Sequence, residues 1–149
     1  MQPVKCTVRG VFMAVSDTAT VPAVVLADGG RRQLTIFVGL WEAISINSAQ
    51  NKEVPPRPLT HDLFLDLMAK YAITVSSLNI DSVDDGVFYA HLELSSGHDV
   101  DYLDCRPSDG IAVALRANAP IFVDEELLTG DGKEGYISDM VDFSAFLRE

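Results

Sequence analysis

The sequence predicts an α+β domain with a mixed, mostly antiparallel β-sheet of about seven strands, built from hairpins, and with three or four helices. The tight-turn pairs Asp28-Gly29 and Asp85-Gly86 separate short runs of apolar and β-branched residues, which is the pattern of β-hairpins. Between these runs lie segments whose apolar residues recur every three or four positions, the spacing of an amphipathic helix. Hairpins with interspersed helices imply the α+β class.

Composition and charge fit one globular domain. The 149 residues are 48% hydrophobic, which allows a sizeable core. No apolar run approaches the roughly 20 residues that span a bilayer, and the N-terminus begins directly with a strand pattern, so we expect a cytoplasmic protein without a membrane segment. Cys6 and Cys105 lack metal-site spacing and are expected to be free thiols. The net charge of −11 opposes tight, non-specific binding to nucleic acid, but it does not exclude an enzyme that grips a nucleic acid briefly.

The first part of the chain predicts three strands and a helix. Residues 4–15 alternate like a half-buried strand, with a bulge or bend at Gly10. Residues 23–27 and 34–38 form the clearest hairpin in the sequence. A helix is expected to follow over residues 40–50.

The middle of the chain begins with a stiff, proline-rich connector over residues 51–58. A second helix is predicted over residues 60–72. Residues 73–83 and 87–94 then form a hairpin, followed by a strand over residues 100–105. The apolar stripe of the second helix is expected to face the core and consists of Leu63, Phe64, Leu67, Met68 and Tyr71.

The last part of the chain begins with a third helix, which is expected to end near Asn118. A short strand over residues 120–123 and a helical turn over residues 124–128 follow. A flexible loop is expected over residues 130–135 because it is rich in glycine. The final helix is expected to be capped by Ser138-Asp139 and to carry Met140, Val141, Phe143, Phe146 and Leu147.

Two of these helix starts share a motif. Residues 57–62 read Arg-Pro-Leu-Thr-His-Asp, and residues 106–109 read Arg-Pro-Ser-Asp. The hydroxyl residues Thr60 and Ser108 are expected to cap the helices by accepting a hydrogen bond from a first-turn N–H. An arginine beside a helix N-terminus adds to the positive potential there, which is how proteins hold phosphates and carboxylates. The same pattern also fits a structural helix start in which each arginine pairs with the nearby aspartate.

Several blocks of sequence stand in order along the chain, at residues 26–38, 42–44, 57–63, 85–90, 106–112, 114–116 and 120–121. Together they resemble the bifunctional nuclease domain over roughly residues 1–128, which leaves residues 129–149 as an acidic loop and helix appended to the same domain. The usual pattern has Ala where this chain has Gly110, and commonly Ala at the place of Cys105. The resemblance implies an α+β fold, cleavage of both DNA and RNA, and a homo-oligomer, with a dimer favoured.

A nuclease that hydrolyses phosphodiester bonds needs an activated water and positive charge against the phosphate oxygens. Asp62 and Asp109 would also hold a divalent Mg or Mn ion, because carboxylate oxygens suit such hard cations. His61 would act as a general acid or base, because its intrinsic pKa lies near neutrality. The candidate catalytic residues are His61, Asp62, Asp109 and Glu42. The candidate substrate-binding residues are Arg57, Thr60, Arg106 and Ser108.

The alternative is a non-catalytic module of the same fold that binds a small anion or another protein. In that case each arginine would pair internally with an aspartate, and Glu42 would only complement the dipole of its own helix. The acidic net charge and the lack of a recognised metal motif favour this alternative. The two hypotheses differ in one structural consequence. Convergence of Arg57, Asp62, Arg106 and Asp109 in one open cleft would favour the nuclease, whereas arginines buried against carboxylates would count against it.

Overall fold

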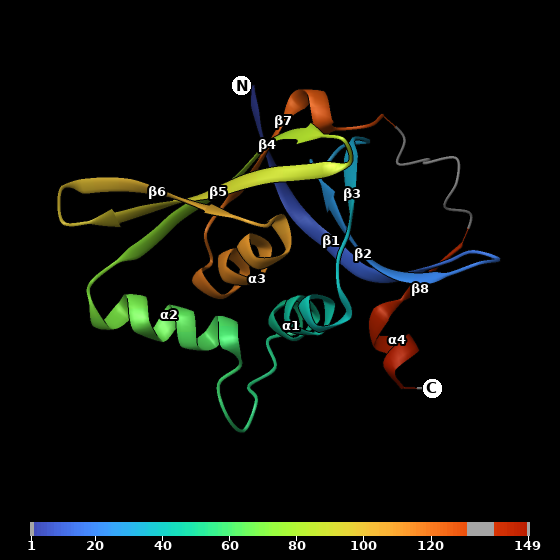
Figure 1. The fold of residues 1–149 in the computed structure, drawn as a ribbon, viewed down its shortest axis with the longest axis horizontal. Coiled ribbons are helices and arrows are strands. Elements are labelled where there is room, and N and C mark those ends of the chain that lie inside the picture. The colour runs from blue at the N-terminus through green and yellow to red at the C-terminus, as the bar shows by residue number, and fades with distance from the viewer. Residues whose placement is uncertain (1, 131–138, 149) are drawn as a thin grey trace.

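The fold is one eight-stranded sheet with helices packed on it, seen in a computed structural model that describes residues 2–130 and 139–148 (Figure 1). This confirms the predicted α+β class. In chain order the elements are β1 (Pro3–Val15), β2 (Thr20–Ala27), β3 (Gln33–Phe37), α1 (Leu40–Gln50), α2 (Thr60–Lys70), β4 (Thr74–Asp84), β5 (Val87–Ser96), β6 (Asp99–Cys105), α3 (Pro107–Ala117), β7 (Ile121–Asp124), the 3₁₀ turn η1 (Glu125–Leu127), β8 (Asp139–Asp142) and α4 (Phe143–Leu147).

Two hairpin units are joined by a central strand. The strand order is β3-β2-β1-β7-β4-β5-β6, and β8 pairs with β1 outside this order. β7 runs antiparallel to β1 and parallel to β4, which makes the sheet mixed. β1 connects its own unit, β1–β3, to β7, because Pro3–Cys6 pairs with β7 while its later residues pair with β2. The predicted bulge at Gly10 is confirmed by a register shift between Val8 and Gly10.

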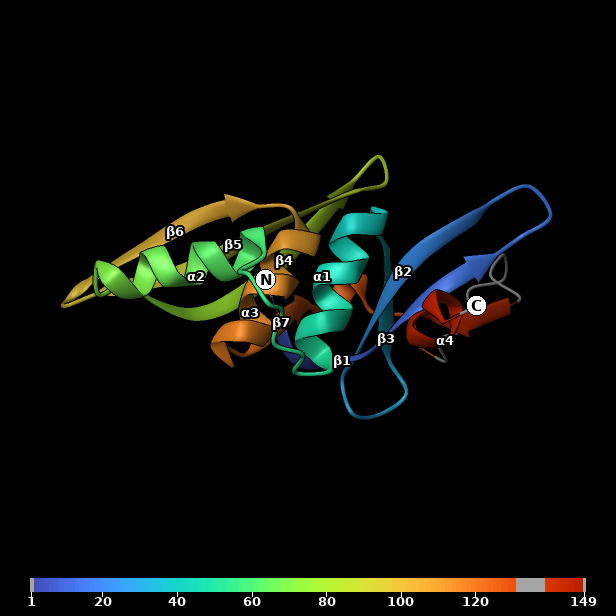
Figure 2. The same ribbon diagram turned by 90° about the horizontal axis from the view of Figure 1, so that it is seen from below.

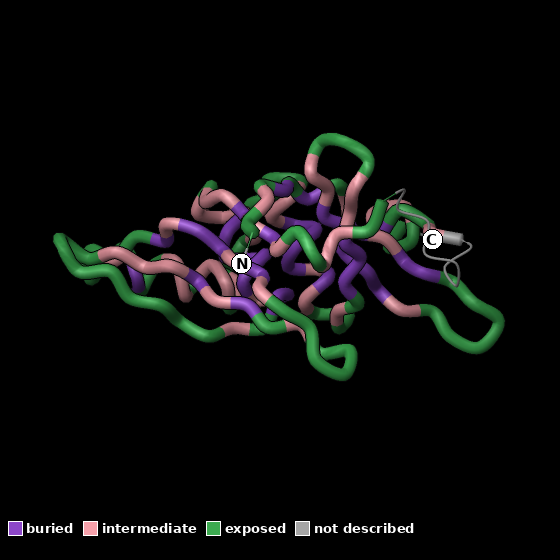
Figure 3. Tube along the Cα trace, turned by 90° about the horizontal axis from the view of Figure 1, so that it is seen from above, coloured by how far each residue is buried: buried purple, intermediate pink, exposed green. Residues whose placement is uncertain are grey.

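The helices α1, α2 and α3 lie together in front of the sheet when the molecule is seen from below (Figure 2). α3 contacts β4 and β5 and touches both α1 and α2, so it is the centre of the helical layer. Figure 3 shows that buried residues gather in the middle of the molecule, while the ends of the long hairpins are exposed. The largest fully buried side chains are Phe143, Leu26, Ile46, Leu78, Ile80, Leu92, Ile111, Val24 and Val123.

The helix starts differ from the predicted capping. α2 is capped by Leu59, not by Thr60, and the Asp62 carboxylate accepts a hydrogen bond from the Leu59 N–H at 2.9 Å. α3 is capped by Arg106, with no side-chain hydrogen bond at the cap, and Pro107 is its first residue. The prediction that Thr60 and Ser108 cap the helices is therefore wrong. Both residues already lie inside the first turn of their helix, after the N-cap residue. An aspartate in the first turn takes over the acceptor role at α2.

The C-terminal region also differs from the prediction of one helix. Met140 and Val141 lie in β8, which pairs with Met13 and Ala14 of β1. α4 begins only at Phe143, where the Asp142 side chain accepts a hydrogen bond from the Ala145 N–H at 3.1 Å. A short apolar run does not distinguish strand from helix, and pairing with β1 decides for the strand. The predicted cap Ser138 and loop residues 131–135 lie outside the described residues.

The predicted apolar stripe of α2 is only partly buried. Met68 is buried and Phe64 packs against the core, but Leu63, Leu67 and Tyr71 are exposed. α2 lies at the margin of the helical layer, where α3 covers one of its flanks and leaves the other uncovered. Within residues 2–130 and 139–148, no helix has the length and apolar composition to cross a bilayer.

Candidate functional site

The two Arg-Pro helix starts meet, and a histidine joins them. His61 of α2 places Nε2 2.9 Å from Asp109 Oδ1 of α3 and Nδ1 2.6 Å from Ser45 Oγ of α1. A carboxylate can only accept, so Nε2 carries the proton and donates it to Asp109. The imidazole therefore connects three helices at one point.

Arg106 extends this cluster toward solvent. Its Nε donates to Asp109 Oδ2 at 2.9 Å, and its Nη2 lies 3.1 Å from Glu42 Oε1. The Glu42 carboxylate folds back against Gly39, where a Cβ would lie 2.5 Å from Glu42 Oε2, so the missing side chain makes room for it. Arg106 nevertheless keeps 65% of its side chain exposed. The guanidinium is thus held by two carboxylates and still accessible to a ligand.

Opposing effects act on the Asp109 carboxyl. Burial raises its pKa, but the hydrogen bonds and positive charges of Arg106 and His61 outweigh burial and hold the pKa below its usual value. Asp109 is consequently ionised at neutral pH. The balance depends on Arg106, which supplies the largest of the lowering effects.

Asp62 belongs to a separate ion pair. Its Oδ1 accepts from Arg116 Nε at 2.7 Å, and burial of the carboxyl is outweighed by Arg116 and the Leu59 N–H, so its pKa is lowered. Arg116 is only 10% exposed and also donates to the carbonyls of Ala112 and Ser45, at 3.0 and 3.3 Å. Asp62 and Arg116 therefore tie α2 to α3 and α1, away from the exposed guanidinium of Arg106.

The remaining predicted residues do not join the cluster directly. Arg57 and Thr60 are exposed, and within the described chain Arg57 makes neither a hydrogen bond nor an ion pair. Ser108 is buried and lines a hollow of about 350 Å³ beside Arg106. Phe37 and Phe88 line the same hollow, which lies between the end of β3, the β4–β5 turn and the start of α3. Four of the eight candidates, His61, Asp109, Arg106 and Glu42, are thus brought together.

Two residues of this region were not among the predicted site residues. Ser45 lies in the middle of α1 and gave no signal, because a serine inside a helix carries no motif of its own. Arg116 stands in the last turn of α3, where a basic residue already suits the helix dipole, so its pairing with Asp62 could not be read from the sequence.

The carboxylates as they stand do not fit a resident divalent ion. Both oxygens of Asp109 accept hydrogen bonds from Arg106 and His61, and both oxygens of Asp62 accept from Arg116 and Leu59. In the part of the chain that the structure describes, no three His, Cys, Asp or Glu side chains gather as metal ligands. Magnesium and manganese require several oxygen ligands. The hydrogen bonds of Asp62 and Asp109 thus count against a resident ion at these two carboxylates, and the Mg or Mn ion stays a prediction.

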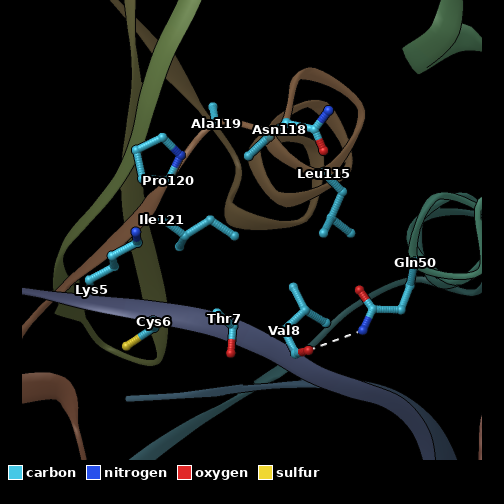
Figure 4. A pocket seen from close by; sticks show the side chains of 11 residues that line it. Lys5, Cys6, Thr7, Val8, Gln50, Leu115, Asn118, Ala119, Pro120 and Ile121 are labelled. Atoms are coloured by element: carbon cyan, nitrogen blue, oxygen red, sulfur yellow. Dashed lines mark hydrogen bonds between the residues drawn. The ribbon is translucent and has the colours of Figure 1, made fainter. Parts of the chain in front are cut away.

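A second hollow, of about 480 Å³, lies at the other end of α3 (Figure 4). It is lined by Lys5 and Cys6 of β1, and Gln50 donates there to the Val8 carbonyl at 3.1 Å. Burial raises the pKa of the Cys6 thiol to about 11, so the thiol is protonated at neutral pH and is a poor nucleophile. No carboxylate or histidine belongs to the described lining, so we place no chemistry there.

Comparison with known proteins agrees with the resemblance seen in the sequence. The family model of the bifunctional nuclease domain matches residues 24–134. Two relatives, "Uncharacterized protein MT1877" and "Uncharacterized protein Rv1829", come from Mycobacterium tuberculosis strains CDC 1551 / Oshkosh and ATCC 25618 / H37Rv. Each is 38% identical over 126 residues, which cover 84% of this chain and 75% of the relative. The chain belongs to the bifunctional nuclease domain family.

Proposed function

We propose that this domain hydrolyses phosphodiester bonds of nucleic acid at the Arg106–Asp109–His61 cluster. The observation that supports this most is the exposed guanidinium of Arg106, which stands at the N-terminus of α3 and is shared by two carboxylates. A phosphate there would receive both the arginine charge and the positive end of the helix dipole. The predicted cytoplasmic location stays a prediction.

Phosphate binding would change the properties of Asp109. A phosphate that takes hydrogen bonds from Arg106 competes with Asp109 and Glu42 for the same guanidinium. Burial of Asp109 remains while the largest lowering effect is weakened, so the pKa of the carboxyl rises and the carboxylate becomes a better base. Substrate binding and base activation are thereby coupled.

In the proposed hydrolytic step one P–O bond forms and another breaks. A water molecule attacks phosphorus and forms the new P–O bond, Asp109 accepts its proton, and the P–O bond to the leaving oxygen breaks. The leaving oxygen takes a proton from solvent. His61 is a positioning residue in this scheme, because it holds Asp109 through Nε2 and is itself held by Ser45. Ser45 is only 5% exposed and does not reach substrate.

The test is a cleavage assay on single-stranded DNA, duplex DNA and RNA, with and without chelator. Arg106→Gln and Asp109→Asn should each lower the rate by at least tenfold, whereas His61→Gln should lower it less. Arg31→Gln is the matched control, since Arg31 is an exposed arginine at a hairpin tip. Circular dichroism confirms that each variant folds. Unchanged cleavage in Arg106→Gln or Asp109→Asn would refute this assignment of the site.

One observation favours the non-catalytic alternative. Every oxygen of Asp62 and Asp109 already has a donor within the chain, as expected of a structural network. In that case the cluster would bind an anion or stabilise the fold without hydrolysis. Binding of an oligonucleotide that depends on Arg106, together with no cleavage on any substrate, would decide for this alternative.

We also propose that the domain forms a homodimer through the margin of the sheet next to α2. Asp62, Leu65 and Ala69 lie on the flank of α2 that faces α1 and α3, so the apolar flank faces away from them. Figures 1 and 2 both place α2 at the same end of the molecule as the β5–β6 hairpin, whose outer strand β6 is the last strand of the sheet. The exposed apolar residues near this margin are Leu63 and Leu67 of α2, Tyr71 directly after it, and Val100, Tyr102 and Leu103 of β6. Val100 and Tyr102 lie on one face of β6 and Leu103 on the other, because side chains alternate along a strand.

A second copy of the chain fits this margin. Its six apolar residues are between 41% and 70% exposed. Antiparallel pairing of two β6 strands would satisfy the backbone groups of both edges and bring the two α2 flanks together. A two-fold axis at Tyr102 would place each aspartate of β6 opposite an uncharged residue of the partner.

A further inference from the structure

Trp41 is an exposed tryptophan beside the proposed site. It is the one tryptophan of the chain and lies in the first turn of α1. Its residue surface is 77% exposed, although an indole gains much from burial. The described residues therefore leave most of the surface of Trp41 available to a ligand.

Helix geometry places the indole next to the cluster. Trp41 precedes Ser45 by four residues, so both lie on the same side of α1, with Trp41 one turn closer to the helix start. Ser45 holds His61 at 2.6 Å, and Glu42, the residue after Trp41, holds Arg106 at 3.1 Å. The ring consequently stands at the margin of the surface where Arg106 is exposed.

Aromatic residues also line the hollow beside Arg106. Phe37 ends β3 and is 43% exposed, and together with Phe88 it lines the hollow of about 350 Å³ that Arg106 borders. Arg106 thus borders a hollow with two phenyl rings, and Glu42, which holds Arg106, directly follows the exposed Trp41 in α1. Such a combination of cation and aromatic surface is how proteins bind unpaired nucleotides.

We propose that Trp41 stacks on a nucleobase of single-stranded nucleic acid whose phosphate is bound by Arg106, an inference that rests on the proposed function of that site. In a duplex the faces of the bases are covered by their neighbours, so an indole can stack only on an unpaired base. Stacking tolerates every base and both sugars, because every base has a π-face. It also suits a chain with a net charge of −11, in which long-range electrostatics oppose binding.

The fluorescence of Trp41 provides a direct test, since no other tryptophan contributes. The protein is titrated, with chelator present, with a short single-stranded oligothymidylate, with a duplex of equal length and with an abasic strand that has the same phosphates. Stacking predicts quenching by the oligothymidylate alone. Equal quenching by the abasic strand or the duplex would overturn the proposal.

Variants separate this inference from the proposed hydrolysis. Trp41→Ala should weaken binding of a labelled oligothymidylate by roughly 5- to 150-fold, the loss expected for one stacked base, while Trp41→Phe should retain most of the affinity. Leu40→Ala, which removes a neighbouring exposed apolar side chain, is the matched control and should bind normally. The proposal fails if Trp41→Ala binds as tightly as the parent.

The two proposals can fail independently. If Arg106→Gln abolishes binding and Trp41→Ala does not, the phosphate site stands and the stacking is refuted. If the oligothymidylate quenches Trp41 but neither single-stranded DNA, duplex DNA nor RNA is cleaved, the stacking stands and the hydrolysis is refuted. If Trp41→Ala changes the oligomeric state instead of the affinity, the ring belongs to a protein interface and the stacking is refuted.

Discussion

Replacing Arg116 by methionine should destabilise the domain strongly, because this arginine ties three helices together. Its guanidinium donates to Asp62 at 2.7 Å and to the carbonyls of Ala112 and Ser45 at 3.0 and 3.3 Å. Methionine keeps the apolar stem but none of these donors. Losing a hydrogen bond to a charged group costs about 1.5–3 kcal/mol, and the two carbonyl bonds, each at the low end of about 0.5 kcal/mol, add roughly 1 kcal/mol together.

The Asp62 side chain is 27% exposed and can regain some hydration, which favours the lower part of this range. We therefore expect the free energy of unfolding to fall by about 2–3 kcal/mol in Arg116→Met, measured by urea denaturation. Asp62→Asn in the same background should recover about 1 kcal/mol, since it removes the carboxylate charge that has lost its partner. A loss below about 0.5 kcal/mol, or full additivity of the two substitutions, would refute the reasoning.

Three further outcomes are expected. Asp62 has a lowered pKa in the folded chain, so the stability it contributes at neutral pH should be lost as pH falls from about 5 through the folded pKa. In Asp62→Asn the midpoint of urea denaturation should therefore depend less on pH over that range. Gly110→Ala should destabilise the domain, because the new Cβ would meet Leu78 and the Cys105 sulfur. Adding Cys105→Ala should recover part of the lost stability, and thermal melts of the single and double variants would show this. Leu67→Lys should convert the proposed dimer to a monomer in light scattering, whereas Val54→Lys, at an exposed apolar position in the connector between α1 and α2, should not; a persisting dimer would exclude the α2 surface.

The hairpins could be predicted from the sequence because their signals are local. Gly29 and Gly86 have φ angles of +87° and +78°, conformations that glycine adopts without strain, and the strands on either side are the predicted ones. The structure also explains why Cys105 and Gly110 occur together where the usual pattern has alanine. A Cβ at position 110 would compete with the Cys105 sulfur for the space beside Leu78.

The features of the fold and of the site that could not be predicted depend on contacts between segments far apart in the chain. The place of β7 in the sheet, the pairing of β8 with β1 and the bond from Ser45 to His61 leave no periodic pattern. The partner of Asp62 was missed for the same reason, because Arg116 stands 54 residues away. Arg57 and Arg106 carry the same motif, yet only one meets the carboxylates, so a repeated motif did not imply a repeated environment.

The position of β7 sets an order for folding during synthesis. The β1–β3 unit and the β4–β6 unit can each form hairpins as they emerge from the ribosome, but the sheet order joins them through β7. β7 begins at Ile121, so a nascent chain that stops before this residue has two half-sheets with unpaired inner edges. A fragment ending after α3 is therefore expected to be an aggregation-prone intermediate and not a smaller domain.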